Sequence, residues 1–465
     1  MSQRRAPRSA LIGAATTAAA LALFGAGSAP PASAAGSART AAVRGPAPAP
    51  VPIAGDSDVG PWTTSIPQVT SALSALRSPT QTATSTSDLT WTIRARLSSR
   101  GSVAQIGDYA SGQVVEVATG RILWAKNPTV ARVPASNEKL VTAFVALVSM
   151  GESTRFTTPV LQVAAQPATV YLKGSGDPAL SSSQLTAMAS AVATKVKSQG
   201  RTSVAVVVDD SLFPAPTNAT GWKAEWIPGT VAPVRALVVD QVNVVDTSIN
   251  AGQVFAAKLK AAGVTATSVA RGVAPAGAAT IASTSSPTVG QLVQTMLNAS
   301  QNDYAEGLHR LSALRRGHNA DWAGARANAL EVLASRGIDS TSLVINDGSG
   351  LSQTGRLTPL TAIDVLSTIR MTPALNSVVF AAAALPTAGV SGTLADRFDT
   401  APTNCARSIV RAKTGTLATA TALSGVASGV DGRERIFSVI INGVTSTAES
   451  RADVDALAAT ATGCY

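Results

Sequence analysis

Three short strings, far apart in the chain, constrain its fold more than any other feature. The strings are Ser136-Asn137-Glu138-Lys139, Ser300-Gln301-Asn302 and Lys413-Thr414-Gly415. The first opens a segment with helical apolar spacing, the second follows a predicted helix, and the third belongs to a predicted strand. Any one of them arises easily by chance in a chain rich in Ser, Thr and Ala. Their order and settings together predict a fold that brings all three to one site.

The elements expected around these strings indicate an α+β fold, with an antiparallel sheet beside a cluster of helices. Apolar residues make up 45% of the 465 residues, which is enough to fill a large core. The expected elements are a helix over 88–99, a hairpin of strands 113–117 and 121–125, a helix over 140–150, helices over 289–298, 304–314, 321–336 and 358–368, strands over 422–426 and 436–441, and a helix over 451–460.

Residues 153–283 have a different texture from the rest of the chain. Short Val-rich strands such as 204–208 recur there, separated by Thr, Gly and Pro. We interpret this stretch as a β-rich domain inserted into the first domain. The outer domain then comprises residues 61–152 and 284–465.

The first 60 residues look like an export signal and a linker. Three arginines lie within residues 1–8, an apolar run covers 10–24, and small residues at 32 and 34 predict cleavage after Ala34. An uncleaved membrane anchor is the competing interpretation, although the run is short for a spanning helix. Residues 35–60 are rich in Ala and Pro and predict an extended linker.

The charge and the cysteines fit an exported protein. The net charge is +10, and removal of residues 1–34 takes away three arginines and no acids, leaving about +7. This charge allows a peripheral association with wall polymers or lipid head groups, whereas export and the absence of a basic run argue against nucleic acid. Cys405 and Cys464 predict a disulfide, with two free thiols as the alternative, and leave little from which to build a metal site.

Ser136 and Lys139 suit nucleophilic catalysis. A serine hydroxyl needs a base to remove its proton, and positions i and i+3 of a helix lie on one face. A lysine buried near other cations, such as Lys413, loses its proton more easily and can serve as that base. An ordinary helix cap is the alternative role for Ser136. His309 and His318 lie in a helical, charge-rich stretch and are interpreted as surface or cap residues.

The other two strings suit substrate binding and proton transfer. Ser300 can relay a proton and the Asn302 amide can hold a substrate carbonyl, although a plain polar loop has the same composition. Lys413 and the hydroxyls of Thr414 and Thr416 suit a substrate carboxylate. Gly415 permits close approach to the strand backbone, and the N–H groups of Ser136 and Thr416 can form an oxyanion hole.

The sequence resembles the class C low-molecular-mass penicillin-binding proteins, the D-alanyl-D-alanine carboxypeptidase/endopeptidase family, from about Gly112 to the C-terminus. The three strings match the S-x-x-K, S-x-N and K-T-G motifs of the penicillin-recognising serine enzymes. Further strings resemble this family's G-x-G-D-P, D-D-S-x-F, D-G-S-G-L-S and P-x-A-G-x-x-G-T-L segments; they are residues 173–178, 208–213, 346–352 and 385–394.

The resemblance implies a transpeptidase-like fold with one or two domains inserted between the first two motifs, which lie 164 positions apart. We expect the innermost inserted domain to be reduced or absent. The implied activity is hydrolysis of the terminal D-Ala-D-Ala bond, or of cross-links, in peptidoglycan stem peptides outside the cytoplasm. It implies catalysis by Ser136, Lys139 and Ser300, substrate binding by Lys413, inhibition by β-lactams, and no metal or organic cofactor. A β-lactamase and a catalytically silent wall-binding protein are the alternatives.

Overall fold

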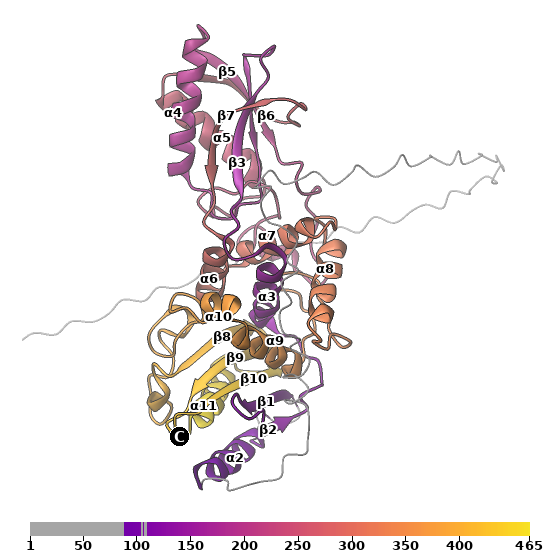
Figure 1. The fold of residues 1–465 in the computed structure, drawn as a ribbon, viewed down its shortest axis with the longest axis vertical. Coiled ribbons are helices and arrows are strands. Elements are labelled where there is room, and N and C mark those ends of the chain that lie inside the picture. Colours follow the sequence, from indigo (N-terminus) through magenta and orange to yellow (C-terminus); the bar gives the residue numbers. More distant parts are fainter. Residues whose placement is uncertain (1–87, 104–105, 107–108) are drawn as a thin grey trace, which may run out of the picture. The chain divides into compact units, whose positions relative to one another are not determined.

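The computed structural model describes residues 88–465, apart from 104–105 and 107–108 (Figure 1). The predicted signal segment over 1–34, the linker over 35–60 and the start of the outer domain at residue 61 lie outside the described residues. Within the described ranges, every helix is too short or too polar to cross a lipid bilayer.

An antiparallel five-stranded sheet carries the third string. Its strand order is β2-β1-β10-β9-β8, so the first and last parts of the chain pair directly through β1 and β10. The predicted hairpin and the two late strands are confirmed. The strands are β1 (Ala110–Glu116), β2 (Ile122–Lys126), β8 (Val410–Leu417), β9 (Ala420–Ser428) and β10 (Glu434–Asn442).

Both faces of this sheet are buried. Successive side chains of a strand point to opposite faces, so Ile436 and Ile440 of β10 join the core of the helical cluster. Phe437 and Val439 point the other way and pack in a second core with α2 (Asp88–Gly101) and α11 (Thr447–Thr462). Burial on both faces explains why β10 has an almost unbroken apolar run over 436–441 and why β9 consists of small and apolar residues.

A cluster of helices covers the first of these faces, with α3 at its centre (Figure 1). α3 contacts α6, α7, α8 and α9. It is apolar on nearly all sides, as expected of a helix enclosed by others, and Gly151, with a φ of 78°, ends it. The helices are α3 (Glu138–Met150), α6 (Val289–Ala299), α7 (Asn302–Arg315), α8 (Trp322–Ser335), α9 (Pro359–Met371) and α10 (Pro373–Val379).

A second five-stranded sheet lies between α3 and α6 in the sequence, with strand order β6-β5-β4-β3-β7. β4, β5 and β6 are parallel and are connected through α4 and α5. Valines of β5 pack on these helices. The sequence analysis predicted the strands but not the helices. The elements are β3 (Thr157–Gln162), β4 (Thr169–Lys173), α4 (Ser182–Ser198), β5 (Ser203–Asp209), α5 (Thr247–Ala261), β6 (Thr265–Arg271) and β7 (Ala279–Ser285).

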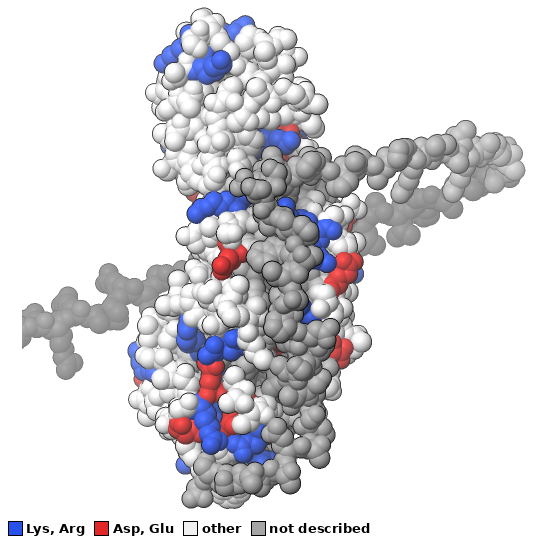
Figure 2. Space-filling view, viewed as in Figure 1, with Lys and Arg blue, Asp and Glu red and all other residues white. Residues whose placement is uncertain are grey.

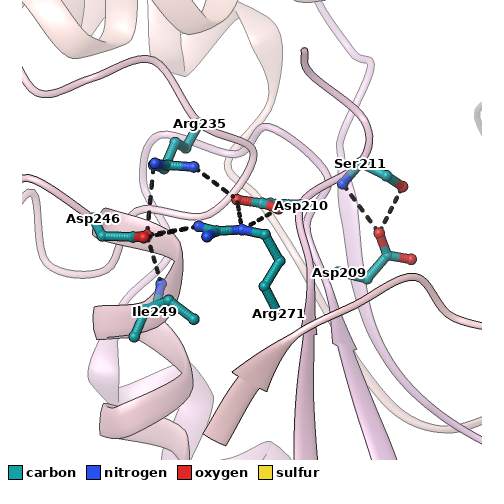
Figure 3. A network of polar contacts seen from close by, with 7 residues as sticks. All are labelled: Asp209, Asp210, Ser211, Arg235, Asp246, Ile249 and Arg271. Atoms are coloured by element: carbon teal, nitrogen blue, oxygen red, sulfur yellow. Dashed lines mark hydrogen bonds and ion pairs between the residues drawn. The ribbon is translucent and has the colours of Figure 1, made fainter. Parts of the chain in front are cut away.

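A network of charged side chains joins the carboxyl ends of β5 and β6 to α5 (Figure 3). Arg271 Nε lies 3.0 Å from Asp210 Oδ1, and Arg271 Nη2 lies 2.9 Å from Asp246 Oδ1. Asp246 also caps α5, because its side chain accepts a hydrogen bond from Ile249 N. Arg235 forms ion pairs with the same two carboxylates. Two cations and two anions therefore balance each other and fix the loops at this edge of the sheet.

Two further features bear on the sequence predictions. The predicted disulfide between Cys405 and Cys464 is present and joins η4 (Thr403–Ala406) to the end of α11. Lys and Arg form small, separated groups on the face shown in Figure 2, with uncharged surface and some acidic groups between them. On this face the positive charge is therefore dispersed.

Candidate active site

Ser136 and Lys139 meet at the beginning of α3. Ser136 belongs to the short helix η1 (Ala135–Asn137), and Lys139 is the second residue of α3. The Lys139 Nζ atom lies 2.9 Å from Ser136 Oγ. The cap position of α3 is occupied by Asn137, without a side-chain capping bond. The Ser136 hydroxyl is therefore engaged with the lysine rather than used as a helix cap.

Two further oxygen atoms lie close to the amine of Lys139. Asn302 Oδ1 is 2.9 Å from Nζ, and the backbone carbonyl oxygen of Ser349 is 2.7 Å from it. Lys139 is fully buried. The lysine is thus held from three sides, by its own helix, by α7 and by the loop over residues 347–352.

Burial lowers the pKa of Lys139 to about 8. The acidic side chains around it, chiefly Glu306 and Asp347, act in the opposite direction and favour the ammonium form. Burial and neighbouring cations were both expected to ease the deprotonation of this lysine. Burial does so, because the charged form loses its hydration. The cation effect is found at Lys413, whose pKa is lowered by burial and by the charge of Lys139. A pKa near neutrality leaves an appreciable fraction of the free amine, as a general base requires.

Ser300 and Lys413 form the second contact of the site. Ser300 ends α6 in the left-handed conformation, with a φ of 57°. Its Oγ lies 2.9 Å from Lys413 Nζ, which also donates to the carbonyl oxygen of Thr414 at 2.8 Å. Lys413 is fully buried, and burial together with the charges of Lys139 and Arg397 holds its pKa well below the usual range.

Asn302 links the strings to one another and to the segment that contains Thr230. Its amide oxygen accepts from Lys139, while its NH₂ group donates to the carbonyl oxygen of Thr230 at 2.9 Å. An amide NH₂ has two hydrogens, so the bond to Thr230 uses only one of them. Asn137 Nδ2 in turn donates to the Lys413 carbonyl oxygen at 3.2 Å. Each of the three strings therefore contacts the other two.

Strand β8 lies directly against the turn that carries Ser136. A Cβ atom at Gly415 would lie 2.7 Å from the Pro134 carbonyl oxygen and 2.9 Å from Asn137 Nδ2. Glycine is therefore needed here for the packing of η1 on β8, a reason that the sequence analysis did not give. Thr414 Oγ1 is 2.7 Å from Thr393 Oγ1, and Thr416 is half-buried at the end of the strand.

A segment between β5 and α5, residues 219–232, borders the site. Trp222 Nε1 donates to Asp347 Oδ2 at 2.7 Å, and Ser352 Oγ donates to the Thr220 carbonyl oxygen at 2.7 Å. On the other side, Ala232 N donates to a carboxylate oxygen of Asp303 at 2.8 Å. Residues 219–232 are thus hydrogen-bonded both to α7 and to the loop over 347–352.

The model of the D-Ala-D-Ala carboxypeptidase 3 (S13) family matches residues 94–249 and 227–463. The chain belongs to this family. It is 33% identical to Carboxypeptidase DacB of Mycolicibacterium smegmatis over 376 residues, covering 76% of this chain and 80% of the relative. The S13 chain is accordingly a serine-type D-Ala-D-Ala carboxypeptidase.

Solved structures share the fold of this S13 carboxypeptidase. Penicillin binding protein 4 (dacB) from Haemophilus influenzae superposes with a TM-score of 0.67 at 20% identity, covering 78% of this chain and 97% of that one. Its complex with a novel β-lactam gives a TM-score of 0.63 at 19% identity with the same coverage. The predicted α+β, transpeptidase-like fold is confirmed.

Sequence reasoning missed three groups around Lys139: Glu306, the Ser349 carbonyl and the segment over 219–232. The loop 346–352 was noted only as part of the family resemblance. Glu306 could have been found from its position four residues after Asn302, on the same face of a largely buried helix. The signal for the segment was its two tryptophans, Trp222 and Trp226, in a chain with only 4% aromatic residues.

The interpretation of the histidines was partly wrong. His309 is buried in α7, and burial lowers its pKa to about 3, with help from the charges of Arg310 and Arg326. It is therefore neutral rather than a surface group. His318 lies nearer the surface, where its Nε2 is 3.0 Å from Glu331 Oε2.

Proposed function

We propose that Ser136 is the nucleophile of a D,D-peptidase that acts on peptidoglycan stem peptides, with Lys139 as its general base. The observation that supports this most is the 2.9 Å contact between Lys139 Nζ and Ser136 Oγ in a site assembled from all three strings. Because burial brings the pKa of Lys139 to about 8, the amine can take the hydroxyl proton near neutral pH.

The reaction proceeds in two acyl transfers. Ser136 Oγ bonds to the carbonyl carbon before the terminal D-alanine, and its proton passes to Lys139. The C–N bond then breaks, and Ser300 gives its hydroxyl proton to the leaving amine while it takes up the proton held by Lys139, which restores the free amine of the lysine. Water attacks the resulting ester, releases the shortened peptide and restores the Ser136 hydroxyl.

The third string binds the substrate in this proposal. Lys413, with the hydroxyls of Thr414 and Thr416, holds the terminal carboxylate through charge-assisted hydrogen bonds. The backbone N–H groups of Ser136 and Thr416 stabilise the negative charge that develops on the carbonyl oxygen. The free hydrogen of the Asn302 amide holds a peptide carbonyl of the substrate.

The test is acylation by a labelled penicillin, followed by intact-protein and peptide mass spectrometry. We expect one adduct, located on Ser136 and absent in Ser136→Ala, that persists for far longer than the acylation takes. Rapid release of hydrolysed penicillin would instead identify a β-lactamase. Failure of the wild-type protein to form any adduct would favour a catalytically silent wall-binding protein.

We further propose that the enzyme acts in the cell envelope. Its substrate lies outside the cytoplasm, and a disulfide such as Cys405–Cys464 persists in oxidising compartments. Mass spectrometry of wall fragments after incubation with the enzyme would separate carboxypeptidase from endopeptidase products. Recovery of the native protein with both thiols free in the cytoplasm would contradict this location.

A further inference from the structure

Glu306 connects α7 to the loop that touches Lys139. It lies one turn after Asn302, so both side chains project from the same face of the helix. Only 1% of Glu306 is exposed. Its two carboxylate oxygens accept hydrogen bonds from two successive backbone amides, Gly348 N at 2.9 Å and Ser349 N at 2.8 Å. The carbonyl of the second of these residues is the one that contacts Lys139.

The loop packs tightly on α7 and α3, and the two hydrogen bonds that Glu306 accepts help to set its position. A Cβ atom at Gly348 would lie 2.5 Å from the Ala305 carbonyl oxygen, so only glycine permits the approach. Thr142 Oγ1, one turn from Lys139 on α3, donates to the Gly348 carbonyl oxygen at 2.6 Å. Asp347 steadies the next turn of the loop by accepting from Gly350 N at 2.9 Å.

The direction of the lysine lone pair depends on this loop. A neutral amine has two N–H bonds and one lone pair. Asn302 Oδ1 and the Ser349 carbonyl oxygen can only accept, so they take the two N–H bonds. The lone pair is then left for the third neighbour, the hydroxyl of Ser136.

We propose that Glu306 is a positioning residue for acylation: it holds the Ser349 carbonyl against Lys139 and so aims the free amine at the Ser136 hydroxyl. The inference rests on the roles proposed above for Ser136 and Lys139. The hydrogen bonds of the Glu306 carboxylate go to the loop, at Gly348 N and Ser349 N, so its positioning effect reaches Lys139 through the loop.

Glu306 also acts on Lys139 by its charge, which provides a second readout. The acids facing Lys139 are Glu306 and Asp303 from α7, Asp347 from the loop and Glu138 from α3, and each raises the pKa of the lysine. Burial and the neighbouring Asp347 raise the pKa of Glu306, whereas its bonds to the amides of Ser349 and Gly348 favour its charged form. Because the Glu306 charge raises the pKa of Lys139, removal of that charge should lower it.

The experiment measures the rate constant for penicillin acylation as a function of pH in two variants. The amount of competent protein is taken from the final yield of adduct. Glu306→Gln keeps the length but can accept only one of the two amides, and Glu306→Asp keeps the charge but is one methylene shorter. Both should lower the plateau rate at least tenfold. The rising limb of the profile should move to lower pH in Glu306→Gln and stay in place in Glu306→Asp.

Asp209→Asn is the matched control. Asp209 is also fully buried, and it binds the backbone amides of Ser211 and Ala274 in the second sheet. This variant should lose stability without a change in acylation rate. If Glu306→Gln has the plateau rate and the rising limb of the wild-type pH profile, the proposal is overturned. If that variant does not fold, a wild-type plateau rate in Glu306→Asp overturns it. The adduct should stay on Ser136 throughout; its absence from the wild-type protein would refute the proposed function instead.

Discussion

At the scale of single residues, two buried lysines give the site its chemistry. Lys139 is under opposing influences, since burial favours its free amine and four carboxyl groups favour its ammonium form. Lys413 has cations for neighbours, so burial and charge both depress its pKa. The two lysines therefore differ in the balance of forces around them. The ammonium form of Lys413, which the proposed carboxylate binding requires, is favoured when an anionic substrate lies beside it.

Acylation should follow the titration of Lys139. The rate should rise with pH and level off above about 8, because only the free amine accepts the Ser136 proton. Lys139→Ala should lose about 10²- to 10⁴-fold in rate, together with this rise. The rate of penicillin acylation, measured between pH 5 and 10 in the wild-type protein and the variant, tests both expectations. Lys195→Ala, at an exposed position on α4, is the control. A wild-type rate in Lys139→Ala would rule out the lysine as base.

Lys413→Ala should impair substrates that end in a carboxylate most. The variant loses the cation proposed to bind that group and the 2.9 Å contact with Ser300. We expect at least a tenfold loss, on the order of one charge-assisted hydrogen bond, for a free-acid peptide and a smaller loss for its amide-capped analogue. Peptide hydrolysis followed by chromatography measures both. Equal losses on the two peptides would leave Lys413 as a partner of Ser300 alone.

At the scale of elements, the two sheets contribute to the site in different ways. The antiparallel sheet brings β8 against η1 and so joins the first and third strings. The second sheet is mixed: β4, β5 and β6 are parallel, so the loops that follow them emerge at one edge, whereas β3 pairs antiparallel with β4 and β7. One of these connections, residues 219–232, reaches the active site, while the ion-pair network around Arg271 ties the strand ends together.

Arg271→Gln tests how much this network contributes. Its side chain is 41% exposed, so solvent screens its ion pairs with Asp210 and Asp246. The free energy of unfolding should fall by no more than about 1 kcal/mol. Urea denaturation at low and high salt measures the loss, which should shrink as salt rises. Lys260→Gln, at an exposed position on α5, should have less effect. A loss of several kcal/mol would mean that the network is a buried structural element.

At the scale of the whole molecule, the C-terminal segment packs against elements from earlier in the chain. α2 and α11 pack together over one face of the antiparallel sheet, and the sheet pairs β1 with β10. The disulfide adds a covalent link across a separation of 59 residues. It joins the end of the chain to the segment that precedes the strand of Lys413.

Reduction of Cys405–Cys464 should lower the melting temperature, because the unfolded chain gains entropy when a loop of this length is opened. The expected loss of stability is about 2–4 kcal/mol. Calorimetry with and without reductant measures the shift. The double variant Cys405→Ser with Cys464→Ser should melt at the lower temperature in both conditions. Equal melting of the oxidised and reduced wild-type protein would show that the bond contributes nothing to stability.

Local signals in the sequence were sufficient for several elements. Thr358 and Pro359 marked the start of α9, where the threonine side chain does accept a bond from Thr361 N. The hairpin of β1 and β2 followed from two short apolar stretches on either side of a turn. α4 was missed because its sequence is mostly Ser, Thr and Ala, which blurs the helical apolar spacing, and most of its stability comes from packing on the second sheet.

The amino-acid sequence by itself determined the reactive groups: a serine and a lysine three positions apart, a second serine with an amide, and a third string with a lysine and a glycine. The tertiary structure decided how these groups work. The depressed pKa of Lys139, the need for glycine at position 415 and the grip of Glu306 on the loop over 347–352 all arise where distant segments pack together. Burial and close approach are properties of that packing, so no local pattern of residues encodes them.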